Sequence, residues 1–297
     1  MSNTLNGLNL EAVADEAIAY LGSEFFPVDL FSTNFSTDIA THGESVTTRI
    51  VSGLTAQDVS SSYASAAQDV TSTAVTTTLS NFKGHVAQFT DLEISKAGSG
   101  EWLMKNFLEP TKEATCKAFV DDLLALITNA NYSNKTTKAA GLFDADVVAD
   151  IAGALTSRKV PQAGRALLVD PDYYTALLKD SSIHDMSAFG NNEAIVDGRL
   201  TRVRGLAVQQ YDAIPGNSEN LTGFACGKSA LVVAVRPVFR PDVRHVKATN
   251  RVEEKTGLPF QFRMWYDPSG GVTYMSAGFL YGVSKGDANA LQRIVSA

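Results

Sequence analysis

The chain has 297 residues, of which 44% are hydrophobic, and a net charge of −7. This composition excludes a disordered chain, the length suggests about two domains, and the longest apolar run, 230–235, is too short to span a membrane. The first 48 residues contain seven acids and no Lys or Arg, which argues against sequence-specific nucleic-acid binding through this segment. Because the first base is Arg49 and the two cysteines cannot form a disulfide framework, we expect a cytosolic protein without a secretory signal.

The N-terminal part is predicted to form a helix followed by an extended arm. Apolar residues at helical spacing predict a helix over residues 10–21. Residues 25–35 contain four Phe and a Pro without a helical period, which favours an extended arm with several apolar anchors. An irregular segment of the chain's own core would give the same pattern, and this alternative stays open.

Residues 45–80 have the most unusual composition, because sixteen of these 36 residues are Ser or Thr. Alternating β-branched residues predict two strands, near 46–51 and near 75–79, joined by a small, polar segment over 55–68. A long polar hairpin with few anchors is only marginally stable alone in water. We therefore expect it to find its partner surface on another subunit, although an ordinary strand pair within a larger sheet is also compatible with the pattern.

A further strand over 82–94 and a long helix are predicted next. Pro110 suits the first position of the helix, which we expect to run for about 20 residues. Its apolar residues recur at spacings of three and four, so one face should be buried. The residues of this stripe are Cys116, Phe119, Val120, Leu123, Ile127 and Ala130.

From residue 140 onward the pattern changes to mixed helices and strands, closed by a long antiparallel hairpin. The predicted elements are a helix around 147–155, a buried strand over 165–169, a helix over 172–179 opened by Asp170 and Pro171, strands over 206–210 and within 224–235, and a hairpin of 260–266 and 272–283 around a turn at 267–271.

Motifs that would carry chemistry are missing or incomplete. The segment 223–229 resembles a phosphate-binding loop, but it has three residues between its glycines instead of four, and a strand rather than a helix is predicted to follow. The four histidines are scattered singly, and the acid pairs Asp144/Asp146 and Asp170/Asp172 are better explained as helix caps. We therefore predict no enzyme, no cofactor and no metal site, and favour a binding or structural role.

The order of these predicted parts resembles that of the major capsid proteins of tailed bacteriophages, which have the Hong Kong-type or Johnson fold. The similarity covers nearly the whole chain, and no single motif in it is diagnostic. It rests on 89–94 followed by Glu109-Pro110 and 118–121, on 164–173, and on 205–209 together with 224–235 and the final hairpin. The resemblance implies an α+β fold with an N-arm (1–42), an E-loop hairpin (43–92), a P-domain with a long spine helix (93–139 and 236–279) and an A-domain (140–235 and 280–297).

The resemblance also implies the function and the partners. We expect a structural protein of the virion that self-assembles into hexamers and pentamers of an icosahedral shell around double-stranded DNA, in the cytoplasm of a bacterial host. The implied partners are a separate scaffolding protein, because the arm helix begins almost at Met1, a portal protein, packaged DNA held by non-specific contacts, and decoration proteins in some shells; no membrane is implied. An encapsulin-like nanocompartment shell and a tail or adhesion protein are the alternatives.

Residues expected at contacts between subunits lie in the arm, in the hairpin and in a basic stretch. The acids of the arm should face bases of neighbouring copies, of which Arg236, Arg240 and Arg244 head the candidate row that continues with Lys247 and Arg251. The remaining candidates are Phe25, Phe26, Asp29, Phe31, Phe35, Val59 and Tyr63. Some relatives cross-link covalently through a Lys of the E-loop, but here Lys83 lies at its base, so we expect no such bond.

Overall fold

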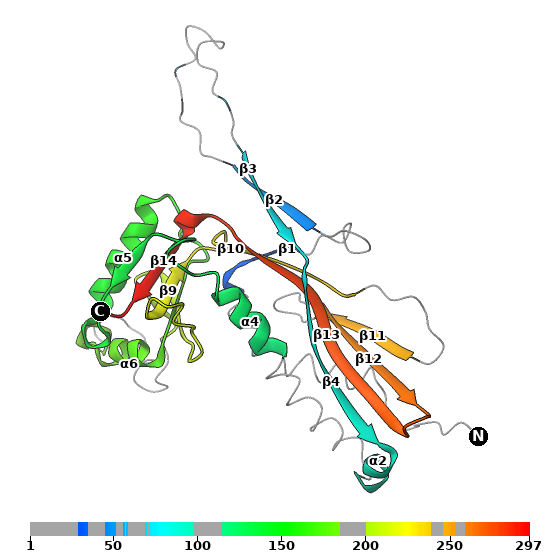
Figure 1. Ribbon diagram of the computed structural model, residues 1–297. Helices are drawn as coiled ribbons and strands as arrows, with labels where there is room; N and C mark the ends of the chain where they lie inside the picture. Colours follow the sequence, from blue (N-terminus) through cyan, green and yellow to red (C-terminus); the bar gives the residue numbers. More distant parts are fainter. Residues whose placement is uncertain are drawn as a thin grey trace.

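Two six-stranded sheets and a separate two-stranded hairpin form the framework of the protein (Figure 1). The structure, a computed structural model, describes residues 29–34, 45–51, 56, 58, 69, 72–97, 115–184, 200–238, 246–252 and 259–297. Within these ranges no helix has the length and apolar character needed to cross a membrane.

The first sheet, called the main sheet below, is built around the 14-residue strand β13 (Val272–Lys285). Tyr274 of β13 pairs with Trp265 on one side and with Gln88 on the other. The C-terminal residues of β13, 280–285, pair with β10. The predicted C-terminal hairpin is thereby confirmed. The other strands of the main sheet are β1 (Ser32–Asn34), β4 (Asn81–Thr90), β10 (Leu231–Arg236), β11 (Val246–Val252) and β12 (Pro259–Asp267).

The strand predicted over 82–94 is wrong in its last four residues, because α2 (Asp91–Ala97) begins there. A reciprocal capping arrangement starts this helix. The backbone N–H of Thr90 donates to Glu93 Oε2 at 2.8 Å, and the backbone N–H of Glu93 donates to Thr90 Oγ1 at 3.3 Å.

The second sheet lies in the mixed helix–strand half of the chain, where most of the sequence predictions are confirmed. Asp144 and Asp170 cap α5 (Ala145–Ser157) and α6 (Pro171–Lys179), each accepting a backbone N–H at 2.9 Å. The strands of this sheet are, in spatial order, β5 (Lys135–Thr137), β14 (Leu291–Val295), β9 (Leu221–Cys226), β6 (Ala166–Val169), β8 (Leu206–Gln210) and β7 (Arg202–Val203). Short helical turns complete it: η3 (Ala140–Leu142), α7 (Ser181–His184) and η4 (Ala288–Ala290).

The single strand predicted within 224–235 is in fact two strands of different sheets. β9 ends at Cys226 in the second sheet, a turn closed by the bond from Ala230 N to Gly227 O (3.1 Å) follows, and β10 enters the main sheet. The segment that resembles a phosphate-binding loop is therefore a turn into a buried strand, as predicted. The implied domain boundaries at 235/236 and 279/280 fall inside β10 and β13, and the division into arm, loop and two domains stays a prediction.

The helix α4 (Lys117–Leu124) packs against one face of the main sheet, where the ring of Phe119 lies 5.2 Å from that of Phe279. The predicted start near Pro110 lies outside the described residues. The predicted end is wrong: the helix ends at Leu124 and Ala130 is exposed, while Ile127 is buried as expected. The side-chain amide of Asn217 donates to the carbonyls of Leu124 and Ile127 at 3.0 and 2.8 Å, which satisfies the helix end at this point.

Candidate functional site

The strands β2 (Ser45–Val51) and β3 (Ser72–Thr78) form an antiparallel pair, called the hairpin below, that projects from one end of the main sheet (Figure 1). It belongs to neither six-stranded sheet, which confirms the predicted strands and excludes their placement in an ordinary large sheet. The hydroxyls of Thr47 and Thr76 are hydrogen-bonded across the pair at 3.3 Å, and both residues are exposed. Most of its tip, including Val59 and Tyr63, lies outside the described residues.

The hairpin is attached to the main sheet through a small set of contacts, called the seat below. Val46 and Leu79 form a small buried cluster with Ala234, against which Leu280 packs. The hydroxyls of Thr77 and Ser284 are hydrogen-bonded to each other, and Gly282 lies directly beneath the backbone of Thr78. A few side chains thus hold a hairpin of two seven-residue strands.

Below the seat, β4 is tied to the helix α4. The ammonium group of Lys83 donates to Asp122 Oδ2 at 2.6 Å, and the hydroxyl of Tyr281 donates to the same oxygen at 2.5 Å. Burial and this hydrogen bond raise the pKa of Tyr281, so its hydroxyl remains a donor at neutral pH. Asp122 therefore joins α4 to two neighbouring strands, and the Lys83 amine is paired with a carboxylate of its own chain.

The main sheet has one packed face and one open face. Phe119 of α4 covers the face that carries Phe279 and Tyr281. On β4 the side chains alternate, and those directed to the other face include Phe82, which is 60% exposed, and Val86, which is 58% exposed. An exposed apolar sheet face of this kind is typical of a surface that a partner covers. Its register neighbours include Leu280 and the stacked rings of Trp265 and Tyr274.

The structure corrects our expectation for Phe31. Its side chain is 3% exposed and its ring lies 6.0 Å from that of Phe224 in the chain's own core. A side chain buried in its own chain has almost no surface left for a neighbour, so Phe31 is not an anchor between subunits. Asp29 is exposed, as an inter-subunit contact requires, and Phe25, Phe26 and Phe35 lie outside the described residues.

The basic row is only partly described, because Arg240 and Arg244 lie outside the described residues. Arg236 ends β10, and its Nε is buried without a hydrogen-bond partner among the described residues. Lys247 and Arg251 lie on β11, where a spacing of four places both on the same face of the strand. Lys247 is exposed, whereas Arg251 donates to the hydroxyl of Thr249 at 3.0 Å.

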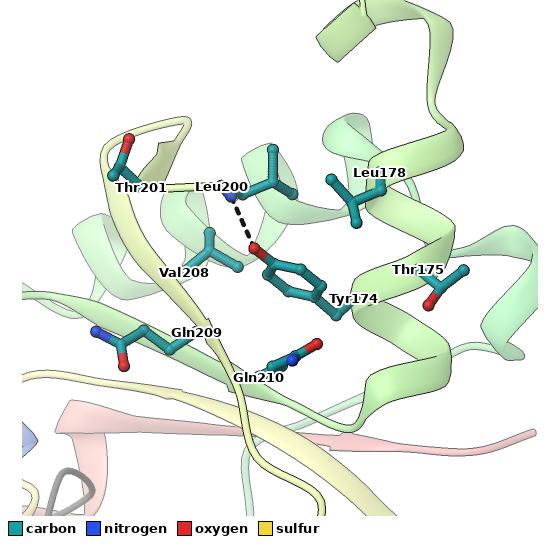
Figure 2. Close-up of a pocket in the computed structure, with 8 residues that line it drawn as sticks. All are labelled: Tyr174, Thr175, Leu178, Leu200, Thr201, Val208, Gln209 and Gln210. Carbon is teal, nitrogen blue, oxygen red and sulfur yellow. Dashed lines mark hydrogen bonds between the residues drawn. The ribbon is translucent and has the colours of Figure 1, made fainter. Parts of the chain in front are cut away.

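A cavity of about 460 Å³ lies between α6 and β8 (Figure 2). Its polar groups are uncharged: the hydroxyl of Tyr174 accepts the backbone N–H of Leu200 at 2.7 Å, and the other polar side chains are those of two Thr and two Gln. Among the described lining residues there is no carboxylate, imidazole or amine, so these residues supply no acid–base pair. Among the described residues no three His, Cys, Asp or Glu side chains are grouped as metal ligands, and burial raises the pKa of the Cys226 thiol to about 12.

Sequence reasoning found the hairpin but missed its seat and the open face. In the sequence Phe82 and Val86 alternate with Lys83 and His85, a pattern that by itself predicts Phe82 and Val86 on the buried face, so their exposure could not be expected from it. Nothing in the local sequence places Gly282 under Thr78, because the two residues are far apart in the chain.

No model of a known protein family matches this sequence, and no curated protein matches it significantly. Solved structures do match over most of their length. A chain of Mycobacterium phage Che8 is 19% identical, with a TM-score of 0.60 over 88% of both chains. A chain from the capsid of the cyanophage P-SCSP1u is 12% identical, with a TM-score of 0.63 over 90% of this chain and 86% of that one. A chain from the mature capsid of bacteriophage PhiM1 is 11% identical, with a TM-score of 0.60 over 90% and 85%.

Identities this low establish the fold alone, and they do so over nearly the whole chain. The α+β fold implied by the resemblance is confirmed: this chain has the fold of tailed-phage capsid proteins.

Proposed function

We propose that this chain is the major capsid protein of a tailed bacteriophage, a structural protein that assembles into the icosahedral shell of the phage head. The observation that carries the proposal is the match to chains of phage capsids over about nine-tenths of this chain and 85–86% of theirs. A match over about nine-tenths of the chain extends well beyond a single sheet.

Two features of the described residues support assembly. The hairpin exposes polar side chains such as Thr47 and Thr76 and is held by few contacts, so it has little to contribute to the stability of a single subunit. The open face exposes Phe82 and Val86, which are 60% and 58% exposed, so burial of what remains exposed would contribute roughly 1–2 kcal/mol per side chain. In a shell, neighbouring copies would provide contacts for the hairpin and would cover the apolar side chains of the open face.

The finer assignments belong to the same proposal. We take Asp29 and the open face as contacts between copies, and retain as candidates the residues that the structure does not describe, which are Phe25, Phe26, Phe35, Val59, Tyr63, Arg240 and Arg244. The partners are further copies of the chain, a separate scaffolding protein, a portal protein and packaged double-stranded DNA. Assembly takes place in the cytoplasm of the bacterial host, and the chain has no enzymatic activity.

The test is co-expression with a scaffolding protein, followed by electron microscopy of the purified product. We expect closed icosahedral shells. Expression of Val86→Lys in parallel should give a folded subunit that fails to form shells, because a charge would be buried on the open face. A wild-type chain that stays monomeric under every co-expression condition would contradict the proposal, and shells that capture an enzyme as cargo would favour a nanocompartment instead.

A further inference from the structure

We infer that Gly282, together with the hydroxyl pair of Thr77 and Ser284, fixes the angle at which the hairpin leaves the main sheet. Gly282 is in this sense a positioning residue for contacts between copies, although its own position is inside the subunit. The effect on shells rests on the proposed function, whereas the angle itself is a property of the single chain.

The close approach of two backbones carries the inference. A Cβ added at Gly282 would lie 2.8 Å from the carbonyl carbon of Thr78 and still nearer to its oxygen, and 3.0 Å from Cγ2 of Thr77. Real Cβ atoms do not come this close to backbone atoms, so one of the two strands has to move. The hairpin backbone can therefore lie where it does because residue 282 has no side chain.

The main sheet is the better-held partner, so the hairpin is the part that moves. Gly282 pairs with Ala234 in a continuous ladder of six residue pairs between β13 and β10. The hairpin has in its place the hydroxyl pair, the small cluster of Val46 and Leu79 with Ala234, and the two-residue link from Thr78 to β4. The link fixes the position of one strand end but leaves its angle free, and one net hydrogen bond and two apolar anchors restrain that angle less than a ladder within a packed sheet does.

A small shift at the seat becomes a larger one further out. Each hairpin strand spans seven residues, which is about 23 Å at 3.3 Å per residue. To relieve the clash, the backbone of Thr78 has to move about 1 Å away from residue 282. If the hairpin does this by tilting about the seat, the outer ends of its strands move by several times that distance. Neighbouring copies would then meet the hairpin at a different angle.

The first experiment measures the angle in the isolated chain. Spin labels at Ala74→Cys, exposed on β3, and Leu142→Cys, exposed in the second half, report the distance between hairpin and body by pulsed EPR; the native cysteines are buried and do not label. We expect Gly282→Ala to shift the mean distance by about 3 Å or more. Gly153→Ala, whose added Cβ meets nothing within 4 Å, is the matched control and should leave the distance unchanged.

Ser284→Ala keeps the inference testable if Gly282→Ala folds poorly. It removes the hydroxyl partner of Thr77 without adding an atom, and should broaden the distance distribution while the far-ultraviolet circular dichroism stays that of the wild type. An unchanged mean distance in Gly282→Ala, or an unchanged distribution in Ser284→Ala, would overturn the inference.

The second experiment examines the shells of the same variants by electron microscopy. We expect Gly282→Ala to give aberrant sizes or open fragments, and Gly153→Ala to give wild-type shells. If the wild-type chain itself forms no shells, the proposed function fails, while the EPR distances still decide whether Gly282 sets the angle. If Gly282→Ala changes the distance but assembles as the wild type does, the hairpin angle does not govern assembly and that part of the inference is wrong.

Discussion

The hairpin and the second sheet show two opposite ways of using polar residues. In the second sheet Arg293 is 1% exposed, forms an ion pair with Glu219, and donates to the carbonyl of Tyr132 and to Asn129 Oδ1, each at 2.7 Å. Of the polar side chains that the structure describes on the hairpin strands, Thr77 is buried and hydrogen-bonded to Ser284, and all the others are exposed. The first region satisfies its polar groups within one chain, and the second leaves them available to a partner.

The main sheet is intermediate, since one face is packed under α4 and the other exposes Phe82 and Val86. Stability and assembly therefore reside in different parts of the molecule. Mutations in the packed parts should change the free energy of unfolding, and mutations in the exposed parts should change assembly. The following predictions test this separation, from the largest expected effect on stability to the smallest.

The largest effect is expected where the arm enters the core. Phe31→Ala removes a buried ring stacked on Phe224 and should lower the free energy of unfolding by about 3–5 kcal/mol, measured by urea denaturation. Phe82→Ala, which removes a ring that is 60% exposed, is the matched control and should change it by no more than about 0.5 kcal/mol. Equal effects of the two variants would show that Phe31 is not part of the core.

A smaller effect is expected where Asp122 links α4 to the strands β4 and β13. Asp122→Asn removes the charge that accepts from Lys83 and Tyr281, and should cost about 1–2 kcal/mol of unfolding free energy. The neighbouring Asp121→Asn breaks an exposed pair with Lys117, 3.4 Å apart one helical turn away, and should cost no more than about 0.5 kcal/mol. Thermal unfolding of both variants would contradict this account if Asp121→Asn were the more harmful.

The smallest effect on stability concerns acid pH. Burial acts to raise the pKa of Asp180, but hydrogen bonds from the backbone N–H of Ala145 and from Ser182, with the nearby Arg204, outweigh it and lower the pKa. A lowered carboxyl pKa stabilises the fold above the unfolded value, and this contribution is lost as the pH falls through the folded value. Asp180→Asn should therefore lose less melting temperature than the wild type between about pH 5 and pH 3. If the melting temperatures of Asp180→Asn and the wild type fell by the same amount over this pH range, Asp180 would contribute nothing to the loss of stability in acid.

Much of the second half could be predicted from sequence, because its signals are local. The caps at Asp144 and Asp170 and the turn around 267–271 act on neighbouring residues, and the structure has them as predicted. The failures arise where a distant residue decides the outcome. The end of α4 depends on Asn217, which lies more than 90 residues beyond the helix, and periodicity alone extended the helix to Ala130.

The candidate site was predictable in part for the same reason. A composition rich in Ser and Thr with alternating β-branched residues indicated the hairpin, since both signals lie within one segment. The aromatic spacing of the arm does not show that Phe31 reaches a core ring of β9, because Phe224 lies far away in the sequence. The seat joins residues of β3 and β13 that are about 200 positions apart in the sequence, so no local pattern in either segment predicts the contact.

The central claim is that the hairpin serves assembly and not the fold of the subunit, and its direct test is a deletion. Residues 55–68 are replaced by a short Gly-Ser turn, and the variant is compared with the wild type by urea denaturation and by electron microscopy after co-expression with a scaffolding protein. We predict an unfolding free energy within about 1 kcal/mol of the wild type and a loss of closed shells. A fall of several kcal/mol, or shells of normal size and yield, would contradict the claim.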